Sequence, residues 1–158
     1  MKDPIERQYG NKLRVRVSGL LIEEEKILLV KHKGLGGGHL WAPPGGGMEY
    51  GSSAEENLKR EFLEETGLEV RVLKLQFVNE FIKSPLHAIE LFFLVEREGG
   101  KLKLGSDPES DKNHQILEAI NFFSFAEIVA MKENELHNLF RHCRSISGLL
   151  KMNGYFNY

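Results

Sequence analysis

Apolar and polar positions organise two short runs near the start of the chain. Residues 13–22 (LRVRVSGLLI) alternate at first and then become continuously apolar. Residues 26–32 (KILLVKH) form a second apolar run after the charged turn 23–25 (EEE). Alternation indicates a strand with one buried face, and continuous apolar residues indicate a strand that is covered on both faces. The pattern therefore predicts a β-hairpin over these two runs.

The segment after the hairpin, 34–39 (GLGGGH), is too rich in glycine to hold regular structure and predicts a loop. Most such loops are solvated connections. A loop of this kind can also bind substrate, because free backbone N–H groups flanked by Lys31, Lys33 and His39 can approach a diphosphate. Trp41 has two alternatives as well, since its ring can stack on a base or pack beneath the glycine turn that follows.

The next pattern predicts a helix. Ala54, Leu58 and Phe62 recur every four positions, which is the spacing of one helix face, and we expect this face to lie on a sheet. Ser52 and Ser53 each precede a glutamate by three residues, so either serine offers a cap for the start of the helix. The helix is expected to end before Gly67, because glycine readily adopts the left-handed conformation of a helix cap.

Three later segments have the pattern of strands. Residues 68–77 (LEVRVLKLQF) alternate apolar with charged or polar positions, which predicts a half-buried strand. Residues 87–95 (HAIELFFLV) are more continuously apolar, and 118–124 (EAINFFS) predict a last strand. Residues 81–85 (FIKSP) predict a loop between the first two of these strands.

Two helices are predicted for the C-terminal part, over 125–131 and 133–146. Apolar residues at core spacing in the second of them are Leu136, Leu139, Phe140 and Cys143. We therefore expect the Cys143 side chain to pack in the core rather than to act as a nucleophile. His137 and His142 are five positions apart, a spacing that does not bring them to one helix face as metal ligands.

Three carboxylates fall on one face of the helix that precedes Gly67. At ~100° of turn per residue, Glu61, Glu64 and Glu65 lie within about one third of the circumference. Like charges at these spacings repel one another, so the arrangement favours a compensating divalent cation. Taken alone, such a pattern is more commonly a solvated helix face. The glycine turn 45–47 adds a place where the backbone can come close to a ligand.

The whole segment 45–68 resembles the box of the Nudix hydrolases, a pattern of a glycine turn, an Arg-Glu pair and further glutamates. Counted from Gly46, the matching positions are Arg60, Glu61, Phe62, Glu64, Glu65, Gly67 and Leu68, preceded by Pro44 and Gly45. One position departs, because Ser52 stands where the pattern has its first glutamate. In the family that glutamate mostly supports the turn and the helix, so the cluster that faces the metal is complete.

This resemblance implies an α/β fold, a Nudix-type α/β/α sandwich with a mixed sheet, in a single domain over residues 1–158. It implies a Mg²⁺-dependent (or Mn²⁺-dependent) pyrophosphohydrolase that acts on a nucleoside diphosphate linked to another moiety. The candidate substrates are ADP-ribose or a similar nucleotide sugar, or a nucleoside triphosphate. In several Nudix subfamilies a residue about as far beyond the box as Pro85 marks the substrate class, and a proline there resembles the ADP-ribose pyrophosphatases.

The resemblance also implies roles for the residues of the box. Glu61, Glu64 and Glu65 would be metal ligands together with the backbone carbonyl of Gly46, and one of them or a remote glutamate would deprotonate water. Arg60 would orient Glu61 through a charge-assisted hydrogen bond. In many relatives a further group from the C-terminal half completes the metal site. The candidates for it are, in order, Glu118, Glu109 and His114.

Two alternatives stay open beside this enzyme. A Nudix-like sensor would hold a nucleotide or a partner without cleaving it, and Ser52 is the residue that favours this reading. A Nudix isomerase that acts on a prenyl diphosphate is the weaker alternative, because the one cysteine lies near the end of the chain.

Composition and charge restrict the remaining possibilities. The 158 residues suit one domain with its own core, and a net charge of −2 gives no overall basic field for a nucleic acid polymer or an anionic membrane. No apolar run approaches the ~20 residues that cross a bilayer, and the first residues lack the apolar core of a signal peptide. The single Cys143 excludes an internal disulfide and fits a reducing compartment. We therefore expect a cytoplasmic protein with a nucleotide-type small-molecule substrate, and the resemblance also allows a homodimer.

Overall fold

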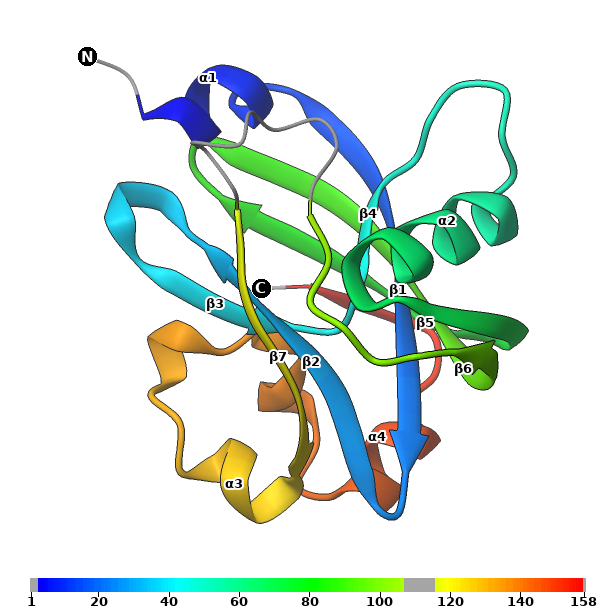
Figure 1. The fold of residues 1–158 in the computed structure, drawn as a ribbon. Coiled ribbons are helices and arrows are strands. Elements are labelled where there is room, and N and C mark those ends of the chain that lie inside the picture. The colour runs from blue at the N-terminus through cyan, green and yellow to red at the C-terminus, as the bar shows by residue number, and fades with distance from the viewer. Residues whose placement is uncertain (1–2, 107–115, 158) are drawn as a thin grey trace.

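The computed structural model describes residues 3–106 and 116–157 (Figure 1). Its strands are β1 (Leu13–Glu23), β2 (Lys26–Lys33), β3 (His39–Ala42), β4 (Gly45–Gly47), β5 (Leu68–Lys83), β6 (Leu86–Gly100), β7 (Leu117–Ser124) and β8 (Tyr155–Asn157). Its α-helices are α1 (Pro4–Tyr9), α2 (Ala54–Thr66), α3 (Phe125–Val129) and α4 (Ile146–Lys151). Short 3₁₀ turns are η1 (Leu35–Gly37), η2 (Glu133–Glu135) and η3 (Asn138–His142). None of the helices in the described ranges is long and apolar enough to cross a membrane.

The strands of these ranges form one mixed sheet with the order β3-β2-β1-β6-β5-β8, to which β4 adds beside β1 and β7 beside β2. β1 runs parallel to β6, so that 13–21 pair with 87–95, and β8 runs parallel to β5. The other pairs are antiparallel. The predicted mixed sheet, the hairpin of β1 and β2 and the strand over 118–124 are confirmed.

The hairpin opens away from its turn. β1 and β2 pair only at Ile22 with Ile27 and at Glu23 with Lys26. Farther along, β1 pairs with β4 and β2 pairs with β3. Because the two strands diverge, they leave room between them at the end of the molecule where α1 lies (Figure 1). The candidate site occupies this space.

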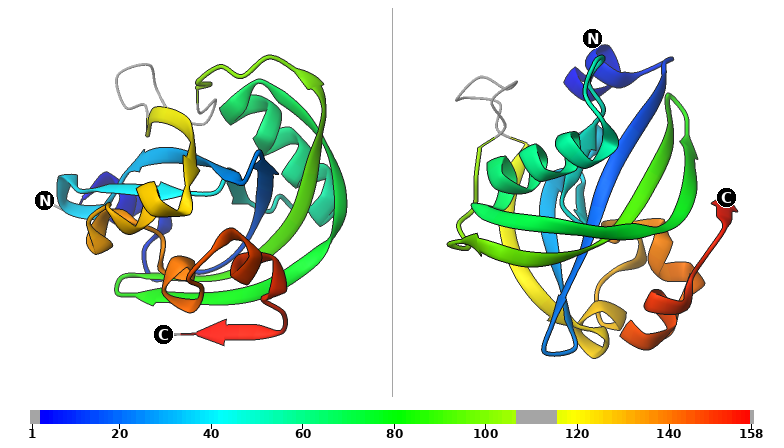
Figure 2. Two further views of the ribbon diagram at one scale, coloured as in Figure 1. Left: turned by 90° about the horizontal axis from the view of Figure 1, so that it is seen from below. Right: turned by 90° about the vertical axis from the view of Figure 1, so that its right-hand side faces the viewer.

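Alternation along the central strands divides the core into two clusters. Leu20 and Leu29 belong to one cluster and their neighbours Leu21 and Leu28 to the other, as successive side chains of a strand require. α2 covers the second cluster with Leu58 and Phe62, whose ring is fully buried. The C-terminal segments cover the first, so that helical segments lie on both sides of the sheet (Figure 2). The predicted α/β/α sandwich is confirmed.

The ends of α2 are set by local chemistry. Ser53 is the N-cap, because its hydroxyl accepts a hydrogen bond from the Glu56 N–H and the Glu56 carboxylate accepts one from the Ser53 N–H. The prediction of Ser53 as a cap is thus confirmed, whereas the alternative at Ser52 is wrong. Gly67 ends the helix in the left-handed conformation, with φ of 70°, as predicted.

Two predictions about loops need correction. The loop predicted over 81–85 is much shorter, because β5 and β6 keep pairing as far as Lys83 and Leu86. The glycine-rich loop is also shorter than predicted, since His39 begins strand β3, which pairs with the end of β2. In both places a backbone ladder with a neighbouring strand extends regular structure beyond what the local pattern indicates.

The helix predicted over 133–146 is wrong. The chain forms η2 and η3 instead, and Leu136 between them is extended. The N–H of His137 donates to the backbone carbonyl of Trp41 at 2.9 Å, which a continuous helix would not allow. The side chain of His137 meanwhile reaches the buried Glu90. These tertiary hydrogen bonds therefore override the helix that the spacing of apolar residues indicates.

Replacing Gly19 by alanine is expected to lower the free energy of unfolding by about 1–3 kcal/mol, since overpacking of a filled core costs that much. A Cβ atom at Gly19 would lie 2.3 Å from a ring atom of Phe62, whose side chain is fully buried in the core. Gly47→Ala is the matched control, because a Cβ there meets no atom within 4 Å. Urea unfolding of both variants checks this prediction, and equal stabilities would contradict it.

Candidate active site

The glycine turn and α2 meet at one side of the site. The N–H of Gly45 donates to Oε2 of Glu65 at 3.0 Å, which ties the turn to a buried carboxylate. A Cβ atom at Gly46 would lie 2.4 Å from the carboxylate carbon of Glu61. Only glycine therefore lets the backbone of β4 approach the acidic face of α2 this closely.

Arg60 holds the other carboxylates of this cluster. Its guanidinium lies 3.0 Å from Oε1 of Glu61 and 3.1 Å from Oε2 of Glu64. A third contact, at 3.3 Å, joins it to Oε1 of Glu49 in the turn before the helix. Glu49 thus brings a carboxylate to this turn although Ser52 does not.

Burial is the main cause that raises the pKa of Glu61 to about 7, and repulsion by Glu64 adds to it, while attraction to Arg60 opposes it. A carboxylate in such surroundings is stabilised by an added cation. Oxygen donors from Glu61, Glu64 and Glu65 are the ligands that Mg²⁺ prefers. In residues 3–106 and 116–157, however, no three His, Cys, Asp or Glu side chains converge on a metal position. Arg60 contacts Glu61 and Glu64, and the Gly45 N–H donates to Glu65.

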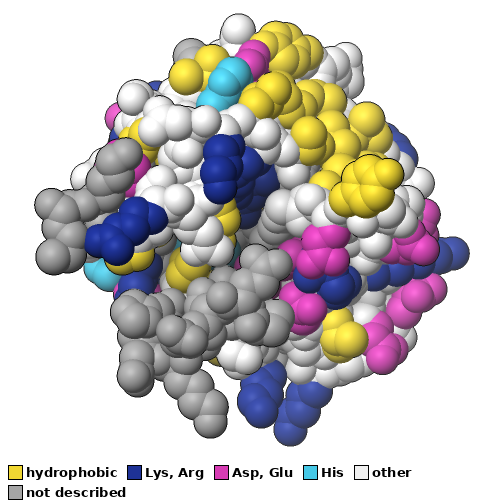
Figure 3. All heavy atoms as spheres, turned by 90° about the horizontal axis from the view of Figure 1, so that it is seen from above, with side chains coloured by type: hydrophobic (Ala, Val, Ile, Leu, Met, Phe, Trp, Pro, Cys, Tyr) yellow, Lys and Arg dark blue, Asp and Glu magenta, His cyan; other side chains and the backbone are white. Residues whose placement is uncertain are grey.

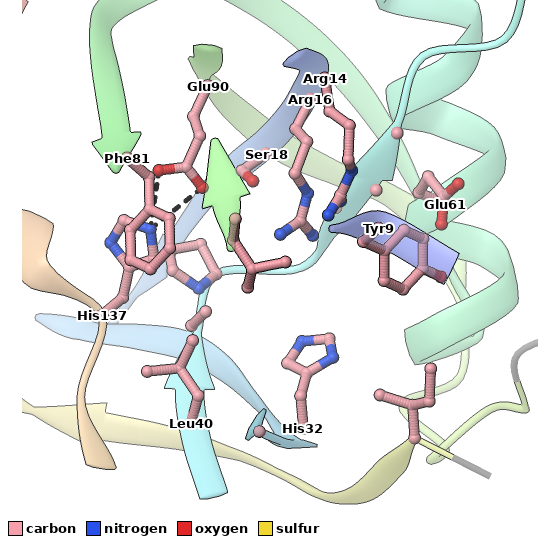
Figure 4. Close-up of a pocket in the computed structure, with 18 of the residues that line it drawn as sticks. Tyr9, Arg14, Arg16, Ser18, His32, Leu40, Glu61, Phe81, Glu90 and His137 are labelled. Atoms are coloured by element: carbon pink, nitrogen blue, oxygen red, sulfur yellow. Dashed lines mark hydrogen bonds and ion pairs between the residues drawn. The ribbon is translucent and has the colours of Figure 1, made fainter. Parts of the chain in front are cut away.

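A cavity of about 620 Å³ opens beside the carboxylates. Its walls come from β1, β2, β3, β4 and α2, and from β5 and β6. In the close-up, Glu61 lies on one side, Arg14 and Arg16 project into the middle, and Phe81, Glu90 and His137 lie on the other side (Figure 4). Seen from above, acidic side chains gather around basic ones next to exposed hydrophobic side chains (Figure 3). The cavity therefore has an acidic side, a basic centre and a side with an aromatic ring.

The side away from α2 contains a buried polar pair. Nε2 of His137 lies 2.9 and 3.1 Å from the two carboxylate oxygens of Glu90. Nδ1 of the same ring accepts a hydrogen bond from the Leu139 N–H, so Nε2 is the nitrogen that donates to Glu90. Burial alone would raise the pKa of Glu90, but His137, Arg16 and the Asn79 amide together lower it.

Comparison with known proteins agrees with this geometry. The model of the NUDIX domain matches residues 12–143, which include the whole glycine turn and α2. The chain belongs to the NUDIX domain family.

Relatives in this family include enzymes. The ADP-ribose pyrophosphatase of Methanocaldococcus jannaschii is 39% identical over 95 residues, which make up 59% of this chain and 56% of that protein. The match thus spans little more than half of the length of that relative. The MutT NUDIX hydrolase of Burkholderia pseudomallei has a TM-score of 0.68 at 21% identity, covering 89% of this chain and 98% of that one. An ADP-ribose pyrophosphatase of Streptococcus suis has a TM-score of 0.60 at 21% identity, covering 90% and 98%. The two structures show a shared Nudix fold.

The residues predicted outside the Nudix box lie in different places. Lys33 and His39 line the cavity, whereas Lys31, Trp41 and Glu118 are not among the described residues that line it. The Trp41 ring packs edge-to-face on Phe123, with centroids 4.8 Å apart, which is the packing alternative of the two. Oε2 of Glu118 lies 2.7 Å from Nδ1 of His39, a close electrostatic contact without the direction of a hydrogen bond. Glu109 and His114 lie outside the described residues.

Cys143 is a core residue of the Nudix fold, as predicted. It lies in the first hydrophobic cluster, and burial raises the pKa of its thiol to about 11. A thiol that stays protonated at neutral pH is a poor nucleophile. This placement gives no support to the isomerase alternative.

Several cavity residues were missed in the sequence, of which Arg14 and Arg16 are the clearest. The signal was present, because the alternation of β1 puts Arg14, Arg16 and Ser18 on one face of a strand that otherwise reads as apolar. Glu90 and His137 gave no such signal. They are 47 positions apart and meet only in the folded chain.

Replacing His32 by glutamine is expected to weaken the acid sensitivity of this Nudix domain. Burial, with a contribution from the positive charge of Arg16, lowers the pKa of His32 to about 3. The unfolded chain takes up a proton near pH 6.5 and the folded chain does not, so the free energy of unfolding falls as the pH decreases from about 6.5 towards 3. Urea unfolding at pH 7 and pH 5 measures this difference, which should be smaller in His32→Gln. An equal pH dependence in both proteins would contradict the role of His32.

Proposed function

We propose that this chain is a divalent-metal-dependent hydrolase that cleaves nucleoside diphosphates linked to another moiety. The observation that carries the proposal is the acidic face of α2 against the glycine turn at one side of a cavity with a basic centre. An acidic face and a basic centre together suit a diphosphate anion. A metal bound to the carboxylates and the nearby guanidinium groups would each neutralise part of its charge.

Glu61, Glu64, Glu65 and the backbone carbonyl of Gly46 would hold Mg²⁺ or Mn²⁺. Such an ion, when bound, neutralises charge on the diphosphate and lowers the pKa of water at the site. The close approach of the Gly46 backbone to the Glu61 carboxylate supports this set, because it places two members of the set side by side. The contacts of Arg60 with Glu61 and Glu64 hold these two carboxylates in place.

The reaction is a hydrolysis of the P–O–P linkage. The oxygen of water bonds to one phosphorus atom and the bond from that phosphorus to the bridging oxygen breaks, which for ADP-ribose or a nucleotide sugar releases two phosphomonoesters. A carboxylate of the acidic face takes the proton of the attacking water. Glu61, Glu64 and Glu65 all line the cavity and are the candidates for this base.

ADP-ribose or a similar nucleotide sugar is the substrate class that we place first. The M. jannaschii relative, which shares 39% identity over 95 residues, is an ADP-ribose pyrophosphatase. The test is a panel of ADP-ribose, nucleotide sugars, dinucleotides and nucleoside triphosphates, assayed with Mg²⁺ or Mn²⁺ and again with EDTA. Product from at least one compound, lost in EDTA, is the expected result.

A non-catalytic sensor is the competing outcome of the same panel. Tight binding of ADP-ribose in a calorimeter, without product over hours in the presence of metal, would select the sensor and reject hydrolysis. The contacts of Glu49 with Arg60 argue for the enzyme, because they keep the box arginine in place although Ser52 lacks a carboxylate.

A further inference from the structure

Two arginines share one face of β1 in the centre of the cavity. Arg14 and Arg16 are two positions apart on the strand, so their side chains point the same way. The parallel neighbour β6 places Ala88 beside Arg14 and Glu90 beside Arg16. Figure 4 shows both guanidinium groups directed into the cavity, side by side.

These two positive charges have no carboxylate bound to them within residues 3–106 and 116–157. Glu90 is the acidic neighbour in register with Arg16, but its oxygens are engaged by His137 and by the Asn79 amide. Nε of Arg16 is buried and has no hydrogen-bond partner there. Arg14 packs against the ring of Tyr9, with the guanidinium carbon 4.2 Å from the ring centre.

The pair is electrostatically unfavourable as it stands. Burial and repulsion by Arg16 lower the pKa of Arg14 to about 10. Buried polar groups without partners are costly, and two adjacent guanidinium groups present several N–H donors in fixed planes. An oxyanion between them would satisfy these donors and remove the repulsion, and a phosphoryl group matches guanidinium geometry especially well.

Position decides which part of a ligand meets the arginines. They lie between Glu61 and the Phe81–His137 side (Figure 4). Arg16 is close enough to both Glu61 and Glu90 to influence the pKa of each. A substrate that reaches from the carboxylates of α2 toward Phe81 must therefore pass the two arginines.

We propose that Arg14 and Arg16 form an anion-binding subsite that takes a phosphoryl group of the substrate without the help of a divalent metal. The subsite selects ligands with two linked phosphoryl groups, one for the acidic face and one for the arginines, over nucleosides and other uncharged compounds. This inference deepens the proposed function and rests on it for the identity of the ligand as a substrate. The binding of the anion itself does not require turnover.

The experiment is calorimetric titration of the full chain with inorganic pyrophosphate in EDTA at low salt. Wild-type protein is expected to bind one pyrophosphate. Arg14→Gln and Arg16→Gln should each weaken binding by about tenfold to a hundredfold, the usual effect of losing hydrogen bonds to a charged group. Arg16→Lys should lie between these variants and wild type, because it keeps the charge but not the fork of donors.

Two further variants separate the subsite from general charge effects. Arg71→Gln removes an exposed arginine that pairs with Glu96 on the outside of the sheet, and should bind pyrophosphate like wild type. Glu61→Gln should bind at least as tightly, because it removes a negative charge from the cavity. Melting temperatures of all variants show whether a loss of binding reflects unfolding, and Arg16→Lys provides the second reading if either glutamine variant fails to fold.

The inference is overturned if wild type fails to bind pyrophosphate in EDTA, or if Arg14→Gln and Arg16→Gln bind as well as Arg71→Gln. Failure of the proposed function looks different. Arginine-dependent pyrophosphate binding without hydrolysis of any compound in the panel would leave the subsite in place and reject the enzyme. Metal-dependent hydrolysis with a KM unaffected by Arg16→Gln would instead support the enzyme and reject the arginine subsite.

Discussion

Replacing Glu64 by glutamine is expected to lower turnover by about a hundredfold to a thousandfold, the loss typical of removing one charge-stabilising group from an active site. Glu64 lines the cavity, and its Oε2 lies 3.1 Å from Nη1 of Arg60. Glutamine keeps the shape and can still accept from Arg60, but it has no charge to offer a divalent cation. Steady-state rates with Mg²⁺, on the panel compound that wild type hydrolyses, measure the effect.

The same helix provides the control. Glu55 is exposed and forms an ion pair with Lys59 at 2.8 Å. Glu55→Gln should therefore keep wild-type turnover and nearly wild-type stability, since exposed pairs contribute at most about 1 kcal/mol. If folded Glu64→Gln turned over as fast as Glu55→Gln, Glu64 would not be a metal ligand.

Replacing His137 by leucine is expected to lower the free energy of unfolding by about 3 kcal/mol or more, because the buried Glu90 carboxylate loses its histidine partner and keeps only the Asn79 amide. Both residues of the pair are almost completely buried, with side chains 4% exposed. The Leu139 N–H would also lose its acceptor. Urea unfolding at pH 7 gives the difference.

A similar pair on the surface is the matched comparison. Nε2 of His87 lies 2.7 Å from Oε1 of Glu80, but the His87 side chain is 39% exposed. His87→Leu should therefore cost about 1 kcal/mol or less. The double variant Glu90→Leu with His137→Leu should be more stable than His137→Leu alone, because no unpaired charge is then left in the core. A double variant less stable than His137→Leu alone would contradict the view that the unpaired Glu90 charge causes the loss of stability.

Local patterns predicted the elements whose stability depends on near neighbours in the chain. The hairpin of β1 and β2 follows from two apolar runs and a charged turn, in which Glu24 and Glu25 adopt positive φ. α2 follows from its apolar stripe, its Ser53 cap and Gly67, all within helical reach of one another. Its acidic face was predictable for the same reason, since a helix fixes which residues share a side.

Contacts between distant residues decided where the prediction failed. Residues 133–146 have the apolar spacing of a helix, yet the hydrogen bonds from His137 to Trp41 and to Glu90 replace it with 3₁₀ turns. β3 forms because His39 and its neighbours pair with β2, although the preceding glycines favour a loop. Trp41 and Glu90 are far from His137 in sequence, so no local pattern indicated those contacts, whereas β3 pairs with the strand that directly precedes it.

The sequence by itself determined the mixed α/β character, the helix α2 and the row of carboxylates on it, because side-chain period and capping act over a few residues. Only the tertiary structure decided what faces those carboxylates. The divergence of β1 and β2 opens a cavity, the pairing of β1 with β6 sets Arg16 beside Glu90, and the C-terminal turns bring His137 to the same place. These groups come together through strand pairing and burial, which join residues far apart in the chain, and they give the acidic helix a basic neighbour.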